Sequence, residues 1–276
     1  MKNFSVFLLC LIINFSVSAA DEPAFERIMR TNTIRCGYII YPPQLIKDVA
    51  TDEISGFAHD IIEYIAGELN LKVEWVEETG TASMIESLKN GRFDLLCNPV
   101  WTSTPRAREA YFTTPVFFTA VHAYARVEDT RFDQNIEKLN NSEYKIAVMD
   151  GSSSPVIAAT DFPKAQTVSL MELTDFTHLL LEVSTGKADV TFSEKAQAED
   201  FLKMNPNSIR RIPLKRPVRL FGNAYMMARG ENDLQNMLNT ALFNAQNNGA
   251  IDRILDEYEH YPNSYYRLSV PYAPEK

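Results

Sequence analysis

The chain has 276 residues, which is long for one domain and enough for two, each with its own hydrophobic core. It carries 27 basic and 36 acidic residues, for a net charge of −9. A surface this acidic repels nucleic acid and anionic lipid, so we expect neither as a partner. The net charge of the chain does not determine whether a ligand pocket is positively or negatively charged.

The first 20 residues have the pattern of a secretory signal peptide. Lys2 precedes the apolar run 6–13, and the small residues 18–20 (Ser-Ala-Ala) suit cleavage. The run is too short to span a bilayer, and no later segment reaches the ~20 apolar residues that a membrane helix needs. We therefore expect an exported, soluble mature chain, located in the periplasm if the source is a bacterium.

Strands and helices alternate in the first half of the mature chain. The pattern predicts strands at 33–37, 73–76 and 93–97, separated by helices at 55–71 and 84–89. This order is typical of a parallel sheet covered on both faces. Ligands bind beyond the carboxyl ends of the strands in such sheets. Tyr38, Tyr41, Trp101 and Arg106 follow those ends.

The stretch 93–117 holds the strongest candidate for a binding residue. After strand 93–97 we expect a turn at Asn98 and Pro99, then a helix with Thr104 as N-cap and Pro105 in the first position. A helix N-terminus favours an anion, and Arg106 adds a planar fork of donors that matches a carboxylate. An ordinary surface helix with a solvated arginine explains the same residues, and both interpretations stay open here.

The alternation restarts in the second half. We expect strands at 144–149, 165–170 and 188–192, a serine-rich turn into a helix at 151–155, a helix at 174–185, and Glu194 just past the last strand. Two extended apolar segments, 115–127 and 220–228, are predicted to connect two lobes, and helix 233–258 returns to the first lobe. The predicted division is 21–117 with 226–276 for the first lobe and 118–225 for the second. A ligand cleft between the lobes follows.

In their order and spacing these segments resemble the family 3 solute-binding proteins of bacterial ABC importers, which bind polar amino acids. The resemblance rests on IRCGYIIYPP, GFAHDIIEYIAGELNL, NGRFDLL, STPRAREAYFTTP, KIAVMDGSSS, TGKADVTFSE and FGNAYMMARGENDL. It implies an α/β, two-lobed Venus-flytrap fold (type II periplasmic binding protein), each lobe a mostly parallel sheet flanked by helices, with two hinge crossings. It also implies a monomeric periplasmic receptor that delivers an amino acid-like ligand to a membrane permease, without catalysis or cofactor.

The resemblance assigns roles to three residues. Arg106 matches the arginine that holds the ligand α-carboxylate, Ser103 the hydroxyl residue that assists it, and Glu194 the acid of the second lobe that receives the α-ammonium. Physical chemistry agrees, because each charge of a zwitterion taken out of water needs a partner. A solvated loop acid is the alternative for Glu194. Arg108 lies two residues beyond Arg106 on the helix and is expected to point away.

Weaker assignments follow the same resemblance. Tyr38 and Tyr41 fall where the first lobe contributes pocket residues, and Ser152 and Ser153 fall where the second lobe contributes donors. Ordinary loop roles are the alternative for all four.

Two positions depart from the family pattern. Thr81 stands where an aromatic lid is frequent, and Trp101 stands where a small or hydroxyl residue is usual. Trp101 either replaces the missing lid or fills the pocket and excludes ordinary amino acids.

The cysteines and histidines indicate no catalytic or metal site. Cys36 and Cys97 lie near the ends of two predicted strands, so a disulfide and a pair of buried thiols are both open. The four histidines have no ligand spacing, and we expect no metal.

Two further functions remain open at this stage. One is a periplasmic dehydratase of the cyclohexadienyl type, in which Glu194 would protonate a leaving hydroxyl. The other is a ligand-sensing receptor that signals to a membrane partner.

Overall fold

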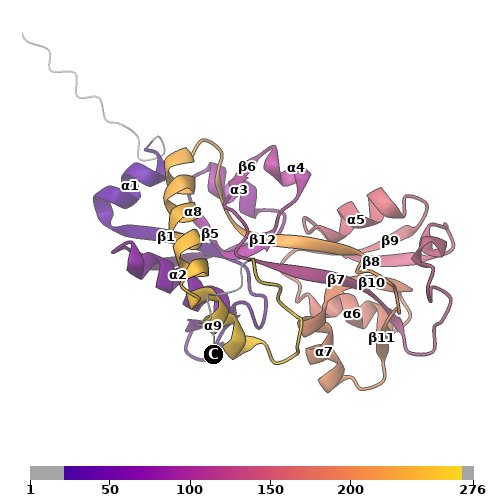
Figure 1. Ribbon diagram of the computed structural model, residues 1–276. Helices are drawn as coiled ribbons and strands as arrows, with labels where there is room; N and C mark the ends of the chain where they lie inside the picture. The colour runs from indigo at the N-terminus through magenta and orange to yellow at the C-terminus, as the bar shows by residue number, and fades with distance from the viewer. Residues whose placement is uncertain (1–21, 269–276) are drawn as a thin grey trace, which may run out of the picture.

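The computed structural model describes residues 22–268 and shows two lobes joined by two long strands (Figure 1). The first lobe is built from both ends of the described chain. It contains α1 (Ala24–Thr31), β1 (Thr33–Tyr38), β2 (Ile46–Lys47), β3 (Ile54–Ser55), α2 (Phe57–Glu68), β4 (Lys72–Glu78), α3 (Met84–Lys89), β5 (Leu95–Trp101), α4 (Thr104–Ala107), β6 (Ala110–Phe112), α8 (Asn232–Asn247) and α9 (Ala250–Tyr258).

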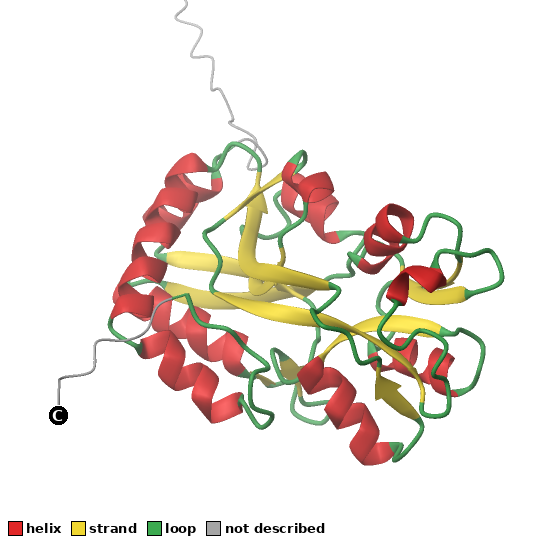
Figure 2. Ribbon diagram, turned by 45° about the vertical axis from the view of Figure 1, so that its right-hand side comes forward, coloured by secondary structure: helices red, strands yellow, loops and turns green. Residues whose placement is uncertain are grey.

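The second lobe is formed by one uninterrupted stretch of chain. It contains the 3-10 helix Ile136–Leu139, β8 (Lys145–Met149), α5 (Ser154–Asp161), β9 (Gln166–Leu170), α6 (Thr177–Ser184), β10 (Val190–Glu194), α7 (Lys195–Met204) and β11 (Ile209–Arg211). The long strands β7 (Phe117–Arg126) and β12 (Arg219–Ala228) run between the lobes (Figure 2).

One continuous sheet crosses both lobes, in the order β4-β1-β5-β12-β7-β10-β8-β9. The three strands at each end are parallel, β4-β1-β5 in the first lobe and β10-β8-β9 in the second. The crossing strands β7 and β12 pair antiparallel with each other. The predicted fold class is therefore confirmed: two lobes, each with a mostly parallel sheet flanked by helices, and two crossings.

The hydrophobic cores divide in the same way as the sheet. The main core of the first lobe combines residues from Ile28 to Phe117 with residues from Tyr225 to Tyr265. A core of the second lobe runs from Val121 to Ile212. The predicted boundaries at 117/118 and 225/226 themselves remain a prediction.

A disulfide joins Cys36 of β1 to Cys97 of β5. These strands are parallel neighbours, and the two Cα atoms lie 5.3 Å apart. Of the two alternatives that the sequence left open, the disulfide is the one observed. The next residue, Asn98, accepts the backbone N–H of Ile39 on its Oδ1, so the bond lies at the start of the cleft wall.

Four local predictions were wrong. The predicted helix 233–258 is divided into α8 and α9 at Asn248 and Gly249. Strand β5 does not turn at Asn98 and Pro99 but continues to Trp101, because β12 pairs with it as far as Trp101 and shifts register between Ala224 and Met226. This irregularity accommodates a proline, which has no N–H to donate. The N-cap position of α4 is Ser103 and not Thr104. Glu194 is the last residue of β10, and helix α7 follows it immediately.

The predicted signal peptide lies outside the described residues. Within residues 22–268, no helix has both the length and the apolar character needed to cross a membrane. In the same range, no three His, Cys, Asp or Glu side chains are grouped as metal ligands.

Candidate binding cleft between the lobes

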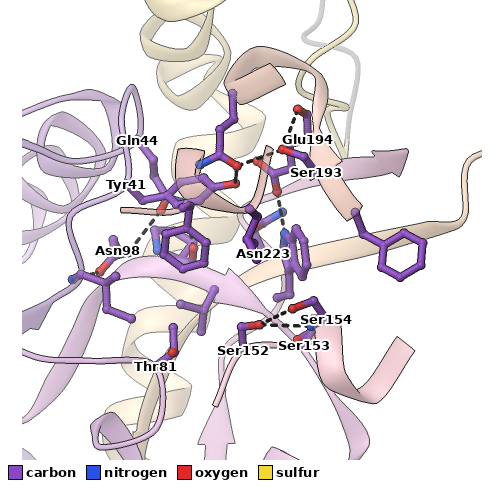
Figure 3. Close-up of a pocket in the computed structure, with 18 of the residues that line it drawn as sticks. Tyr41, Gln44, Thr81, Asn98, Ser152, Ser153, Ser154, Ser193, Glu194 and Asn223 are labelled. Atoms are coloured by element: carbon purple, nitrogen blue, oxygen red, sulfur yellow. Dashed lines mark hydrogen bonds between the residues drawn. The ribbon is translucent and has the colours of Figure 1, made fainter. Parts of the chain in front are cut away.

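A cleft lies between the lobes beside the crossing strands, and side chains from both lobes converge on it (Figure 3). The space between them is about 670 Å³, part of it open to solvent. Its walls are formed by Ile39, Tyr41, Gln44, Thr81, Asn98, Pro99, Val100, Trp101, Arg106, Ser152, Ser153, Ser154, Phe176, Leu179, Phe192, Ser193, Glu194, Gln197 and Asn223.

Arg106 supplies the positive charge of the cleft. It stands in α4, directly after β5, and donates across the cleft to the carbonyl oxygen of Gly151 (2.8 Å) and within its own lobe to that of Trp101 (3.3 Å). Within residues 22–268 no carboxylate lies within 4.0 Å of its guanidinium. Burial lowers the pKa of Arg106 to about 10, so the group stays protonated at neutral pH. Its remaining N–H donors are free for an anion.

Glu194 supplies the negative charge from the other lobe. Its Oε1 accepts the indole N–H of Trp101 (2.6 Å) and the hydroxyl of Thr119 (2.7 Å). The side chain is buried, and among the described residues no Lys, Arg or His pairs with it. Burial raises the pKa of Glu194 above its ordinary value, while these two hydrogen bonds act in the opposite direction. The cleft thus holds a buried acid without a cation.

Trp101, the last residue of β5, lines the cleft beside the crossing strand β12. Its ring stacks on Phe221 with centroids 4.8 Å apart and planes at 11°. Its N–H lies within reach of both Glu194 and Thr119, and its backbone pairs with Asn223 of β12. Stacking and hydrogen bonds together fix the ring against Phe221, where it contacts the acid of the opposite lobe.

Three more of the predicted site residues line the cleft. The hydroxyl of Tyr41 donates to Oε1 of Gln197 (3.3 Å), and its ring meets Phe176 edge to face. The Ser152 hydroxyl donates to the Met149 carbonyl (2.8 Å). The Ser153 hydroxyl is buried and has no hydrogen-bond partner among the described residues.

The structure does not bring Tyr38 or Ser103 into the cleft wall. Tyr38 belongs to the core of the first lobe, with its ring edge-on to Trp75 at 5.8 Å. Ser103 holds the first turn of α4, where its carbonyl accepts the N–H of Ala107. Arg106, Glu194, Tyr41, Trp101, Ser152 and Ser153 are therefore the predicted residues that meet.

Sequence reasoning missed Thr119, Asn223, Gln197 and Phe176. Thr119 and Asn223 face each other from the two crossing strands, with Nδ2 of Asn223 donating to Oγ1 of Thr119 (3.0 Å). Their segments were predicted as plain connectors. Gln197 lies in the first turn of the unpredicted helix α7, three residues after Glu194. A polar residue three positions after an acid at a strand end was the signal that could have identified Gln197.

The two lobes also touch around the rim of the cleft. Glu172 of the second lobe accepts the backbone N–H groups of Ala82 (2.9 Å) and Ser83 (3.0 Å) of the first. The Thr81 hydroxyl donates to the carbonyl of Asp150 (2.6 Å). Together with the contact from Trp101 to Glu194, these bonds hold the lobes in contact.

Comparison with known proteins identifies the family. The model of the bacterial extracellular solute-binding proteins, family 3, matches residues 34–260. The chain belongs to this family. The resemblance drawn from the sequence is thereby confirmed, and the matched range contains every cleft residue named above.

Individual relatives are distant but cover nearly the whole chain. A probable amino-acid ABC transporter-binding protein of Haemophilus influenzae is 25% identical over 94% of this chain and 96% of its own. The cyclohexadienyl dehydratase of Pseudomonas aeruginosa is 24% identical over 81% of this chain and 82% of its own. Among solved structures, an ancestral amino acid-binding protein described as a precursor of cyclohexadienyl dehydratase superposes with a TM-score of 0.74, at 23% identity over 86% of this chain and 99% of that one. The last similarity shows the fold alone.

Proposed function

We propose that this protein captures an amino acid or a related small zwitterion between its lobes and delivers it to the permease of an ABC importer. One observation carries the proposal: the cleft walls contain one basic side chain, Arg106, and one acidic side chain, Glu194, on opposite lobes, and neither has an ion-pair partner within residues 22–268. A zwitterion matches that pair, because it offers a carboxylate to the first and an ammonium to the second.

Capture then follows from the geometry. The first lobe holds the carboxylate through Arg106, and closure brings Glu194 and the Ser152–Ser153 turn onto the other end of the ligand. Only a closed cleft satisfies both ligand charges, so the ligand shifts the population toward the closed form. A permease that recognises the closed form would receive loaded protein. We also propose that the protein is monomeric, that it is located in the periplasm, and that it catalyses no reaction.

The comparisons support this function at the level of the family. The Haemophilus influenzae relative is named as a binding protein of an amino-acid ABC transporter. Transport and sensing use the same closed state, and the family favours transport.

A dehydratase is the second candidate, favoured by the raised pKa of the buried Glu194 and by the Pseudomonas aeruginosa relative. A protonated carboxyl in a dry cleft can act as a general acid. Release of a phenyl product from prephenate or arogenate by the purified protein would support this candidate.

The deciding experiment is isothermal titration calorimetry of the mature protein with the twenty amino acids, each repeated on Arg106→Ala. Stoichiometric binding without turnover, lost in the variant, supports the receptor. Absence of binding by every amino acid contradicts an amino acid as the ligand. Product formation from prephenate or arogenate, lost in Glu194→Gln, would favour the enzyme.

A further inference from the structure

The cleft is lined by two side chains of charged type, which is the number needed to pair with the α-carboxylate and the α-ammonium of an amino acid. Among the side chains that line the cleft, Arg106 is the basic one and Glu194 the acidic one. If they hold the α-carboxylate and the α-ammonium, as in the function proposed above, the cleft keeps no charge for the ligand side chain.

The acids nearest to the cleft are already engaged by the protein. The Glu172 carboxylate accepts two backbone N–H groups from the first lobe. Asp175 accepts the N–H and the hydroxyl of Thr177 at the start of α6. Asp150 accepts the hydroxyl of Ser169. None of these three acids is among the residues that line the cleft.

A hollow beside the cleft shares Tyr41 and Phe176 with it, and their rings meet at 4.9 Å. Its basic group, Lys47, lies 3.3 Å from Asp52 and 3.9 Å from Glu78, and a third acid, Asp175, lies in the same hollow. None of these four charged side chains lines the cleft itself.

Neutral polar atoms, in contrast, are available inside the cleft. Ser153 is 4% exposed, and its buried hydroxyl lacks a partner among the described residues. Gln197 accepts on Oε1 from Tyr41 and Ser193, while its amide N–H groups donate to no described residue. A buried polar atom without a partner is costly, so a ligand that bonds to these atoms gains affinity.

We propose that the cleft selects amino acids whose side chain carries no charge, and that it prefers short hydroxyl or carboxamide side chains that bond to Ser153 and Gln197. This inference rests on the proposed function. A charged side chain would enter the cleft without a counter-charge and lose its hydration, whereas a hydroxyl or amide would replace water with Ser153 and Gln197.

The first test is a calorimetric panel on the wild-type protein. Serine, threonine, asparagine and glutamine are expected to bind at least 100-fold more tightly than arginine, lysine, aspartate and glutamate. Equal or tighter binding by any charged amino acid would overturn this selectivity while leaving the receptor function intact. Failure of all eight, with binding of another of the twenty amino acids, would overturn the selectivity alone, whereas failure of all twenty would also contradict amino acid capture.

The second test reverses the selectivity. Ser153→Asp places a carboxylate at the unpartnered position and is expected to improve binding of arginine or lysine at least tenfold relative to serine. Ser153→Ala is expected to weaken the best neutral ligand about tenfold without that gain. Ser142→Asp, at an exposed serine of the second lobe, is the matched control for added charge and should change nothing. Circular dichroism checks that the Ser153→Asp protein is folded. If the folded variant keeps the wild-type ratio of arginine or lysine affinity to serine affinity, the role of Ser153 is contradicted.

Discussion

The indole N–H of Trp101 lies 2.6 Å from Oε1 of Glu194, and the two residues belong to opposite lobes. The same oxygen also accepts the hydroxyl of Thr119. A buried carboxylate is thus stabilised by neutral donors of the protein itself, one of them from across the cleft. The contact links the departure from the family pattern at Trp101 to the acid that the proposed ligand needs.

Trp101→Phe should destabilise the ligand-free protein. Phenylalanine keeps a ring against Phe221 but removes a hydrogen bond to a buried charged group, and such bonds contribute roughly 1.5–3 kcal/mol. Urea unfolding measures the loss. In a Glu194→Gln background the acceptor is neutral and the loss should fall to about 1 kcal/mol. The same loss in both backgrounds would mean that the bond to Glu194 is not what Trp101 contributes.

Glu194→Gln should stabilise the ligand-free protein at neutral pH. Because burial raises the pKa of Glu194 in the folded state, the folded protein binds this proton more tightly than the unfolded chain does. The wild type therefore loses stability as the pH rises from the ordinary value of 4.5 through the higher folded pKa. Below 4.5 both states are protonated, and the advantage of glutamine should disappear.

Thermal unfolding of both proteins between pH 3.5 and 8 checks this difference. An advantage of Gln that grows on acidification would contradict the direction. The same substitution should weaken binding of a zwitterion, so stability and affinity should change in opposite directions.

Arg106→Ala should abolish capture. Removing one member of a desolvated charge pair costs about 2–5 kcal/mol of binding free energy, or roughly 30- to several-thousand-fold in Kd. Arg108→Ala is the matched control, since Arg108 ends the same helix and is exposed. Titration with the tightest-binding amino acid separates the two variants. Similar losses in both would move the carboxylate site away from Arg106.

Glu172→Ala should favour the open form. The carboxylate of Glu172 accepts two N–H groups from the other lobe, so its removal takes closing energy away without touching the cleft walls. Two such bonds at an exposed rim are worth about 1 kcal/mol, which predicts a roughly fivefold faster ligand dissociation. Glu137→Ala, at an exposed acid of the second lobe, should leave the rate unchanged. Stopped-flow measurement of the dissociation rate compares the two variants.

Loss of the disulfide should lower stability by about 4 kcal/mol, the chain-entropy value for a closed loop of some 60 residues. Cys36 and Cys97 are separated by 61 positions, and both are fully buried. Denaturant unfolding of the Cys36→Ala/Cys97→Ala double variant measures the loss. In the native wild-type protein the disulfide should resist a reductant that reduces it readily in urea, because both sulfurs are inaccessible until the first lobe unfolds.

The sequence predicted the charges of the cleft better than its neutral parts. Arg106 and Glu194 stand at strand ends, where periodicity and turn chemistry place side chains in a cleft. Thr119 and Asn223 could not be found in this way, because they lie inside long apolar strands and face each other only through the pairing of β7 with β12. Tyr38 was assigned to the pocket by its position in the sequence, yet it packs into the core. Successive side chains of a strand point to opposite faces, so a shift of one residue moves a side chain from one face to the other. Pro99 misled for a related reason: the register shift that tolerates it is formed by a strand 120 or more positions later.

The two crossings determine the order in which the lobes can fold. The buried residues of the second-lobe core come from one unbroken stretch, from Val121 to Ile212, so that core can form from this stretch alone. The core of the first lobe waits for Tyr225, Leu238 and Leu255, which are made last. The second lobe should therefore be able to fold before the first, and a truncation before residue 225 should leave Ile61 and its neighbours in α2 without cover.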